Sequence, residues 1–292
     1  MSGASVIVTG ATGLVGRAVA ERLHQNGAAL VAVGRSSAET AAYEFVDIDL
    51  ERRSLDELAD RRPEAIVHCA AHVPGRPDRP DDQMSADATR QIDAGVFAAS
   101  LRLGCRVVYV SSCILYDPLD PLAKTETSDV RAGTPYAAAK LAGEMEAATL
   151  DRSLIMRIPS PVGARMRPTT VLPMFVARAS RGETLEIWGS GTREQDFIHV
   201  RDLAAFVVLA LATDVRGTFN VASGGPVTMR VLADSVVRVV GNGSVRQGNQ
   251  ADPLDGATAR YDIARARSEL GWEPRVNLDE MIRELSAAAG RS

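Results

Sequence analysis

Short apolar runs alternate with longer amphipathic segments through the first half of the chain. Runs with the length and β-branched content of strands are Ser5–Thr9, Leu30–Gly34, Tyr43–Asp47, Ala65–Cys69, Arg106–Ser111 and Leu154–Arg157. Segments between them with helical spacing are Val15–Gln25, Ser54–Asp60, Gln83–Leu103 and Tyr136–Leu150. Strands that alternate with helices build βαβ units, so the pattern predicts an α/β fold with a doubly wound parallel sheet.

The regular alternation of strand-like and helix-like segments ends after Gly163. An apolar segment at Val171–Ser180 and a glycine-rich turn at Trp188–Gly191 predict a second, smaller lobe. Asp202–Ala212 and Thr218–Val221 predict a further helix and strand that return to the sheet. We therefore expect the first domain to comprise residues 1–163 with about 191–222, and a discontinuous C-terminal substrate lobe to comprise about 164–190 and 223–292.

The charge balance narrows the range of ligands. Lys and Arg number 33 against 37 Asp and Glu, which gives a formal net charge of −4. A nucleic-acid binder needs a basic face that displaces counterions from phosphates, so we expect a small-molecule ligand and no nucleic acid. Apolar stretches such as Ala204–Ala212 are far shorter than a membrane span, and no leader pattern precedes Ser5. We expect no membrane partner and a cytoplasmic location.

Cysteine and histidine are sparse. The three cysteines, Cys69, Cys105 and Cys113, are an odd number with no two of them closely spaced, and the four histidines are scattered. This spacing predicts neither a disulfide framework nor a metal site.

A glycine-rich turn joins the first strand to the first helix. The run Val6–Gly16 spaces its glycines as Gly-x-x-Gly-x-x-Gly. Glycine lets the backbone approach a pyrophosphate, and the helix N-terminus offers free N–H groups. The turn predicts a Rossmann-type dinucleotide site with contacts from Gly10, Thr12, Gly13, Leu14, Val15 and Gly16.

The end of the second strand bears on the choice of cofactor. An acidic residue there binds the ribose 2′-hydroxyl of NAD and repels the 2′-phosphate of NADP. Here Gly34 is followed by Arg35 and Ser36, which offer a cation and a hydroxyl to a phosphate. We predict that NADP is preferred, with NAD possible and a merely solvated Arg35 as the alternative.

A catalytic set is predicted from three residues. Tyr136 and Lys140 lie four residues apart at the start of a helix, so they share one face. An adjacent ammonium and a bound nicotinamide cation favour the phenolate of Tyr136, which is otherwise too weak an acid to work near neutral pH. Ser112 ends an apolar strand at the carboxyl edge of the sheet, where its hydroxyl can polarise a carbonyl.

Together these motifs resemble the extended short-chain dehydrogenase/reductase family, in its branch of NAD-dependent epimerases and dehydratases. The similarity extends over nearly the full length and includes Ile66–Ala71, Gly189–Asp202 and Glu269–Pro274. It implies nucleotide-activated sugars as substrates. It also implies further cofactor contacts at Asp49, Leu50, Cys69, Ala70, Ala71 and Ile158, in addition to Tyr136 and Lys140. Candidate substrate contacts are His72, Ser112, Cys113, Ser160, Arg193 and Gln195.

Departures from the family pattern bear on the net reaction. Cys113-Ile114 follows Ser112 where 4,6-dehydratases carry an Asp-Glu pair, which disfavours dehydration. Ser111–Ile114 is similar to a run in GDP-fucose synthases, whose cysteine is an acid, but Leu115 shifts Cys113 out of register and leaves an inert thiol as the alternative. Ser160 and Gln195 replace an asparagine and an arginine that are usual in the family, Arg193 lies close enough to substitute for the arginine, and Thr89 also replaces an asparagine.

The expected function is therefore hydride transfer on a nucleotide-linked sugar. The leading hypothesis is an NADP-preferring reductase of a 4-keto-deoxysugar, and the second is a 4-epimerase that uses the same residues. A non-catalytic nucleotide sensor is a third hypothesis, which the intact catalytic set opposes. By analogy with the family we expect a homodimer formed through the tyrosine-bearing helix and the helix before it.

Overall fold

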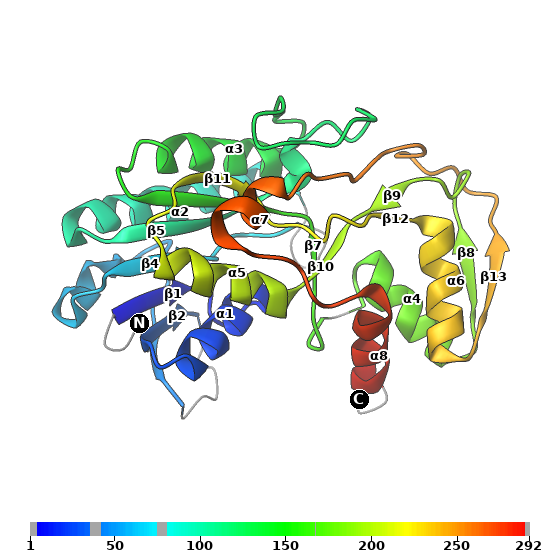
Figure 1. Cartoon of the computed structure of the whole chain (residues 1–292), viewed down its shortest axis with the longest axis horizontal. Coiled ribbons are helices and arrows are strands. Elements are labelled where there is room, and N and C mark those ends of the chain that lie inside the picture. The colour runs from blue at the N-terminus through cyan, green and yellow to red at the C-terminus, as the bar shows by residue number, and fades with distance from the viewer. Residues whose placement is uncertain (1–4, 36–41, 75–80, 167, 290–292) are drawn as a thin grey trace.

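The computed structural model describes residues 5–35, 42–74, 81–166 and 168–289 of the chain. Within these residues, seven parallel strands form the central sheet in the order β11-β6-β5-β4-β1-β2-β3 (Figure 1). The strands are β1 (Ser5–Thr9), β2 (Ala29–Gly34), β3 (Glu44–Asp47), β4 (Ala65–His68), β5 (Arg106–Ser112), β6 (Ser153–Ile158) and β11 (Gly217–Asn220). The predicted doubly wound sheet is confirmed, and its strand order reverses between β1 and β4, where such sheets bind ligands.

Helices cover both faces of the sheet (Figure 1). On one face α1 (Leu14–Gln25) packs against α5 (Val200–Ala212), and on the other α2 (Gln83–Leu103) packs against α3 (Pro135–Ala147). Successive strand residues supply the two cores because side chains alternate across a strand: Val6 and Val8 face α1, whereas Ile7 packs with Ile92 of α2. The helix predicted at Ser54–Asp60 is instead a 3-10 helix, η1 (Leu55–Arg61).

The end points of several elements differ slightly from the prediction. Strand β4 ends at His68, so Cys69 begins the loop, and β5 extends to Ser112. Helix α3 ends at Ala147 rather than at Leu150. Thr134 caps α3, since its side chain accepts a hydrogen bond from the backbone N–H of Ala137.

The chain beyond Ile158 adds elements that hydrophobic periodicity did not predict. Three short strand pairs form: β7 (Ser160–Val162) with β10 (Phe197–His199), β8 (Thr184–Ile187) with β13 (Ser244–Gln247), and β9 (Glu194–Gln195) with β12 (Val227–Thr228). These strands have two to four residues each, too few to show a period. This part of the chain also contains α4 (Val171–Ser180), α6 (Met229–Val240), α7 (Ala264–Leu270) and α8 (Leu278–Ala289). Earlier in the chain, a short 3-10 turn, η2 (Cys113–Leu115), directly follows β5.

A second apolar core lies apart from the sheet. It gathers Leu172 of α4, Leu232 of α6 and Ile282 of α8, which stand together at the end of the molecule away from the N-terminus (Figure 1). Ala266 of α7 and Trp272, by contrast, pack with the α1 side of the sheet. The exact division of the sequence between two lobes stays a prediction.

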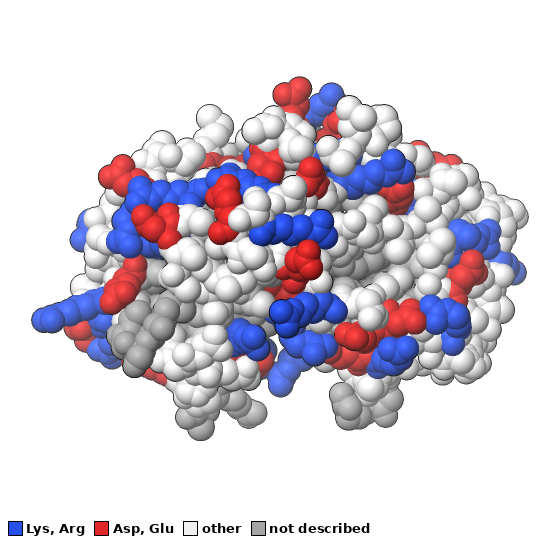
Figure 2. Space-filling view, in the orientation of Figure 1, with Lys and Arg blue, Asp and Glu red and all other residues white. Residues whose placement is uncertain are grey.

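Both charge signs occur on the face of the molecule that Figure 2 shows. Figure 2 shows acidic and basic side chains interleaved across the face it presents. In the described part of the chain, no helix is long and apolar enough to cross a membrane, and no group of His, Cys, Asp or Glu side chains is arranged to hold a metal ion.

Trp272 ties the C-terminal segment to the sheet domain, and its removal tests this packing. It is 2% exposed, stands edge-on to Phe206 at 5.5 Å between ring centroids, and donates from Nε1 to the Asp202 carbonyl at 3.0 Å. We expect Trp272→Ala to lower the free energy of unfolding by about 3–5 kcal/mol in urea titrations. Trp188→Ala, at a residue 48% exposed, is the matched control. A loss below about 1 kcal/mol for Trp272→Ala would contradict this account.

Candidate active site

A cavity of about 1350 Å³ opens at the carboxyl edge of the sheet. Its lining comes from the β1–α1 turn, the ends of β2, β4 and β5, the start of α3, and the elements β7, α4 and β9 that follow β6. The cavity therefore lies at the switch point of the sheet and reaches from there to the second apolar core at Leu172 and Phe197.

The glycine-rich turn is shaped by two close backbone contacts. Gly10 has a positive φ of 65°, and a Cβ there would lie 2.8 Å from the backbone nitrogen of Ala70. A Cβ on Gly16 would lie 2.3 Å from the Gly10 carbonyl oxygen. Gly13 caps α1 without a side-chain hydrogen bond, and no acidic residue lies in the first turn. The first turn of α1 thus lines the cavity and contains no acidic residue that would compete with a ligand for its N–H groups, which fits a dinucleotide pyrophosphate.

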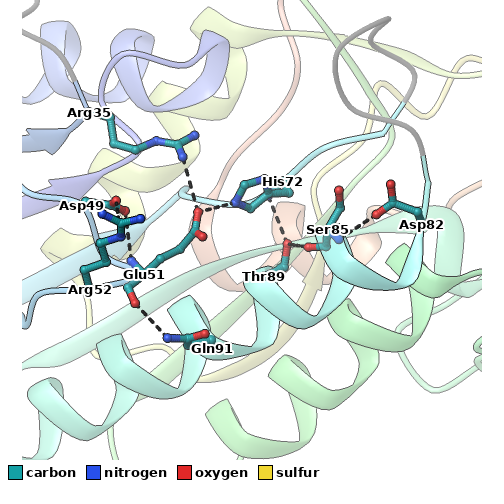
Figure 3. Close-up of polar contacts among 9 residues, drawn as sticks. All are labelled: Arg35, Asp49, Glu51, Arg52, His72, Asp82, Ser85, Thr89 and Gln91. Carbon is teal, nitrogen blue, oxygen red and sulfur yellow. Dashed lines mark hydrogen bonds and ion pairs between the residues drawn. The ribbon is translucent and has the colours of Figure 1, made fainter.

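A chain of polar contacts lies at the end of the cavity where Arg35 and Asp49 are expected to contact the cofactor, here called the adenosine end (Figure 3). The Glu51 carboxylate accepts a hydrogen bond from Arg35 at 3.3 Å and contacts Nε2 of His72 at 2.7 Å. The backbone of Glu51 is fixed as well, because its N–H donates to Asp49 at 3.2 Å and its carbonyl accepts from Gln91 at 2.8 Å. Arg35 is therefore close to an acid that the sequence analysis did not consider.

Ser112 lies where β5 ends and lines the cavity. Its Oγ accepts a hydrogen bond from the Ile114 N–H at 3.2 Å, which leaves the hydroxyl proton available to a ligand. The preceding Ser111 is buried and donates to Glu144 at 2.5 Å. Of the two adjacent serines, Ser112 is therefore the one suited to contact a substrate.

Tyr136 and Lys140 reach the cavity from the first turns of α3. The Tyr136 N–H donates to Asp81 at 2.9 Å, and this contact fixes the start of the helix. The Lys140 ammonium is buried and donates to the Val110 carbonyl at 2.9 Å and to the Tyr109 hydroxyl at 3.2 Å. Both hydrogen bonds hold the Lys140 side chain against β5.

Burial dominates the electrostatics of this pair. It raises the pKa of Tyr136, and the nearby charges of Asp93 and Asp81 raise it further. Burial also lowers the pKa of Lys140, while the negative charge of Asp93 opposes that shift. In the protein alone Tyr136 is therefore held as the neutral phenol, the form that donates a proton.

The substrate end of the cavity is lined by polar groups that are already paired. Gln195 donates to the Ser160 hydroxyl at 2.5 Å, so the two residues that depart from the family pattern contact each other. Arg193 lies 2.9 Å from the buried carboxylate of Asp252. Arg193 is near Gln195 as expected, but Asp252 partly neutralises its charge.

Cys113 does not belong to the described lining of the cavity, whereas Cys69 does. The Cys113 side chain is 3% exposed, and burial raises the pKa of its thiol far above the usual range. Burial also raises the pKa of Cys69, to about 12. The structure therefore favours the inert alternative for Cys113 over a substrate contact or a catalytic acid.

The other predicted site residues converge on this cavity, except Ser36, which lies outside the described residues. Its lining includes Gly10, Thr12, Gly13, Leu14, Val15, Gly16, Arg35, Asp49, Leu50, Cys69, Ala70, Ala71, His72, Ser112, Tyr136, Lys140, Ile158, Ser160, Arg193 and Gln195. The sequence analysis missed Glu51 and the buried Asp93. Glu51 directly follows Asp49-Leu50 and could have been suspected, but no local pattern marks Asp93.

The chain is similar to several known proteins over nearly its full length. The UDP-glucose 4-epimerase of Mycolicibacterium smegmatis is 32% identical over 302 residues, which cover 94% of this chain and 95% of that protein. A dTDP-4-dehydro-6-deoxy-D-allose reductase of a Streptomyces species is 27% identical, with 97% of this chain and 96% of that protein covered. The solved structure of MoeE5 with UDP-glucuronic acid and NAD superposes with a TM-score of 0.83 at 26% identity, covering 98% of this chain and 99% of that one.

The family model described as the NAD dependent epimerase/dehydratase family matches residues 6–222. This match spans the glycine-rich turn, Ser112, Tyr136, Lys140 and the return strand β11. The chain belongs to the NAD-dependent epimerase/dehydratase family, whose members related to it modify nucleotide sugars.

Proposed function

We propose that the protein reduces a keto group on a nucleotide-activated sugar, most simply at C4 of a 4-keto-deoxysugar. The observation that carries this proposal is the convergence of Ser112, Tyr136 and Lys140 with the glycine-rich turn in one cavity. The relative named as a dTDP-4-dehydro-6-deoxy-D-allose reductase supports this class of reaction.

The three side chains have separate tasks. A nicotinamide cofactor supplies the hydride when it is bound. Tyr136 donates its phenolic proton to the sugar oxygen, and the Ser112 hydroxyl donates a hydrogen bond to the same oxygen as negative charge develops there. The Lys140 ammonium binds the cofactor ribose and lowers the cost of forming the Tyr136 phenolate.

The surroundings of Ser112 support reduction over elimination of water. The two residues after Ser112 are Cys113 and Ile114, and the Cys113 thiol is buried outside the cavity lining. A 4,6-elimination needs an acid and a base beside the sugar, and neither of these side chains can serve.

A 4-epimerase is the second candidate, favoured by the position of Glu51. Because Glu51 pairs with Arg35, the cationic site that would recognise NADP is partly neutralised. An epimerase regenerates its cofactor and has no need for the NADPH pool. The 32% identity to a UDP-glucose 4-epimerase supports this candidate as well.

The preference for NADP rests on how readily Arg35 leaves Glu51. The Arg35 side chain is half exposed and its contact with Glu51 is long, at 3.3 Å, whereas His72 lies 2.7 Å from the same carboxylate. Glu51 therefore keeps a partner when Arg35 turns toward a 2′-phosphate. An exposed ion pair of this kind contributes at most about 1 kcal/mol, less than a charge-assisted contact to phosphate.

Cofactor affinity tests this arrangement directly. We expect Arg35→Leu to weaken NADPH binding roughly tenfold or more and to leave NADH binding unchanged, because the lost contact is a charge-assisted hydrogen bond. Glu51→Gln should strengthen NADPH binding several-fold, since a repulsive charge is removed. Dissociation constants from nicotinamide fluorescence give both results. Arg52→Leu, at a more exposed arginine nearby, is the control, and equal losses for NADH and NADPH in Arg35→Leu would argue against phosphate recognition.

The reaction itself is tested with the purified protein and two substrate panels. With NADPH and nucleotide-linked 4-keto-6-deoxyhexoses we expect the absorbance of NADPH to fall, with one NADPH consumed for each sugar reduced. With UDP-glucose or UDP-galactose, formation of the epimer without net cofactor consumption would instead establish the second candidate. Tyr136→Phe should lower turnover by about 10²–10⁴-fold and retain cofactor binding. Tyr43→Phe, on the α1 side of the core, is the control, and wild-type turnover in Tyr136→Phe would refute the assigned role.

We also propose that the protein forms a homodimer through α2 and α3. These helices pack side by side, and their outer faces expose Met84 and Leu101 of α2 and Met145 of α3, at 78%, 67% and 67%. Exposed apolar side chains on two adjacent helices suit a four-helix interface between identical copies.

A charge placed within this face should prevent dimerisation. Ala94 is exposed on α2 between Met84 and Leu101. We expect Ala94→Arg to sediment as a monomer where the wild type sediments as a dimer, because the arginines of two copies would be buried against apolar surface. Leu254→Arg puts the same charge on an exposed residue outside α2 and α3 and should leave the dimer intact.

A further inference from the structure

A continuous chain of buried hydrogen bonds runs beneath the catalytic set. Thr9 Oγ1 lies 2.7 Å from His68 Nδ1, and His68 Nε2 lies 2.9 Å from Asp93 Oδ1. The Tyr109 hydroxyl donates to Asp93 Oδ2 at 2.5 Å and accepts from Lys140 Nζ at 3.2 Å. The five side chains come from β1, β4, α2, β5 and α3, and each is at most 2% exposed.

The chemistry of the donors fixes a direction along this chain. An ionised carboxylate only accepts hydrogen bonds and an ammonium only donates them. The Tyr109 hydroxyl therefore accepts from Lys140 and donates to Asp93. In the tautomer in which His68 donates from Nε2 to the other carboxylate oxygen, Thr9 donates to Nδ1, and every group is satisfied. One negative and one positive charge thus stand at the two sides of a single tyrosine hydroxyl.

The packing around this hydroxyl is tight. A Cβ on Gly143 of α3 would lie 2.2 Å from the Tyr109 hydroxyl and 2.6 Å from Asp93 Oδ2. The backbone of α3 therefore presses on the bridge between Asp93 and Tyr109, and solvent is excluded from it. A buried charge that has no water around it needs a partner charge, so the electrostatic interaction between the paired groups is stronger here than it would be at the surface.

The other ionisable groups near Lys140 supply less negative charge. Cys69, beyond β4, is a protonated thiol because burial raises its pKa to about 12. Glu144 of α3 is paired with Arg157 of β6 at 2.7 Å. Tyr136 of α3 and Tyr109 of β5 are neutral phenols because burial raises the pKa of both. Asp93 remains as the charge that opposes the desolvation of Lys140.

We propose that Asp93, acting through the Tyr109 hydroxyl, is the positioning residue that keeps the buried Lys140 side chain protonated and directed at the active-site cavity. This inference rests on the proposed function only in the use made of Lys140, namely stabilisation of the Tyr136 phenolate. Asp93 itself does not line the described cavity and contacts no reacting atom.

The proposal and a simple through-space charge effect predict opposite changes in the pKa of Tyr136 when the charge of Asp93 is removed. Removal of a negative charge near Tyr136 should by itself lower the pKa of that phenol. If Asp93 instead maintains the Lys140 ammonium, its removal also takes away the cation that stabilises the phenolate, and the pKa of Tyr136 rises. The two accounts therefore predict opposite movements of the same limb of a pH profile.

The composition of the chain permits a direct measurement. Its sequence contains two lysines, Lys124 and Lys140, and both are buried. Protein labelled with ¹³C at lysine Cε therefore gives two signals by nuclear magnetic resonance, and Lys140→Met assigns them. Lys124 donates to Thr258 and the Asp120 carbonyl, apart from this chain of bonds, and serves as an internal reference.

We expect Lys140 to titrate as an ammonium that is protonated at pH 7 in the wild type. Asp93→Asn, which keeps the size and an accepting oxygen for Tyr109, should lower its pKa by at least about one unit, a tenfold loss of proton affinity, with Lys124 unchanged. Asp87→Asn removes an exposed acid from the same helix and should leave both lysines unchanged. Asp93→Ser provides a second neutral variant if Asp93→Asn does not fold.

An unchanged or raised Lys140 pKa in the neutral variants would overturn the inference, as would a deprotonated Lys140 at pH 7 in the wild type. In the NADPH-dependent reaction the protonated Tyr136 is the active form, so turnover falls at high pH as Tyr136 loses its proton. This fall in the pH profile of turnover should move to higher pH in Asp93→Asn, and a movement to lower pH would overturn the inference. A shifted lysine signal without turnover on any nucleotide sugar would reject the proposed function alone. Turnover with an unshifted signal would reject the role of Asp93 alone.

Discussion

The close crossing of two backbones at the switch point of the sheet is the constraint on which the cavity depends. The β1–α1 turn meets the residues after β4 so tightly that a single Cβ at Gly10 would overlap the backbone of Ala70. Because no side chain fills this point, the N-terminus of α1 stays open to the cavity and the strand ends on either side diverge around it. The phosphate cradle and the space for the nicotinamide end both follow from that crossing.

Charges buried behind the cavity are held in pairs that link elements far apart in the sequence. Arg157 of β6 binds Glu144 of α3, and Asp93 of α2 reaches Lys140 of α3 through Tyr109 of β5. Each pair joins a helix to the sheet or to another helix beneath the carboxyl edge. A charge that has left water is costly unless its partner is fixed, so these contacts specify how α2 and α3 sit against β5 and β6. The geometry of Tyr136 and Ser112 is a product of that fixed packing.

The two ends of the cavity differ in how firmly their polar groups are committed. Near the reacting carbon, the Ser112 hydroxyl accepts from Ile114 and keeps its own proton for a ligand, and among the described residues no hydrogen bond engages the Tyr136 hydroxyl. At the adenosine end Arg35 is shared with Glu51, and at the substrate end Arg193 is shared with Asp252 and Gln195 with Ser160. The catalytic end is therefore a general hydride-transfer site, and discrimination among cofactors and substrates depends on whether these paired groups exchange partners on binding.

The sequence by itself determined the parallel sheet, the glycine-rich turn and the set of Ser112, Tyr136 and Lys140, because each is marked by a local pattern: strand and helix periods, glycine spacing, and two side chains one helical turn apart. It did not reveal the strand pairs that form beyond Ile158, whose strands are too short to show a period. It also did not reveal that Glu51 meets Arg35, that Cys113 is buried away from the cavity, or that Asp93 lies behind Lys140. Those facts depend on which elements pack together, and only the tertiary structure brings residues 16, 21 or 31 positions apart into contact within a medium where charge is costly.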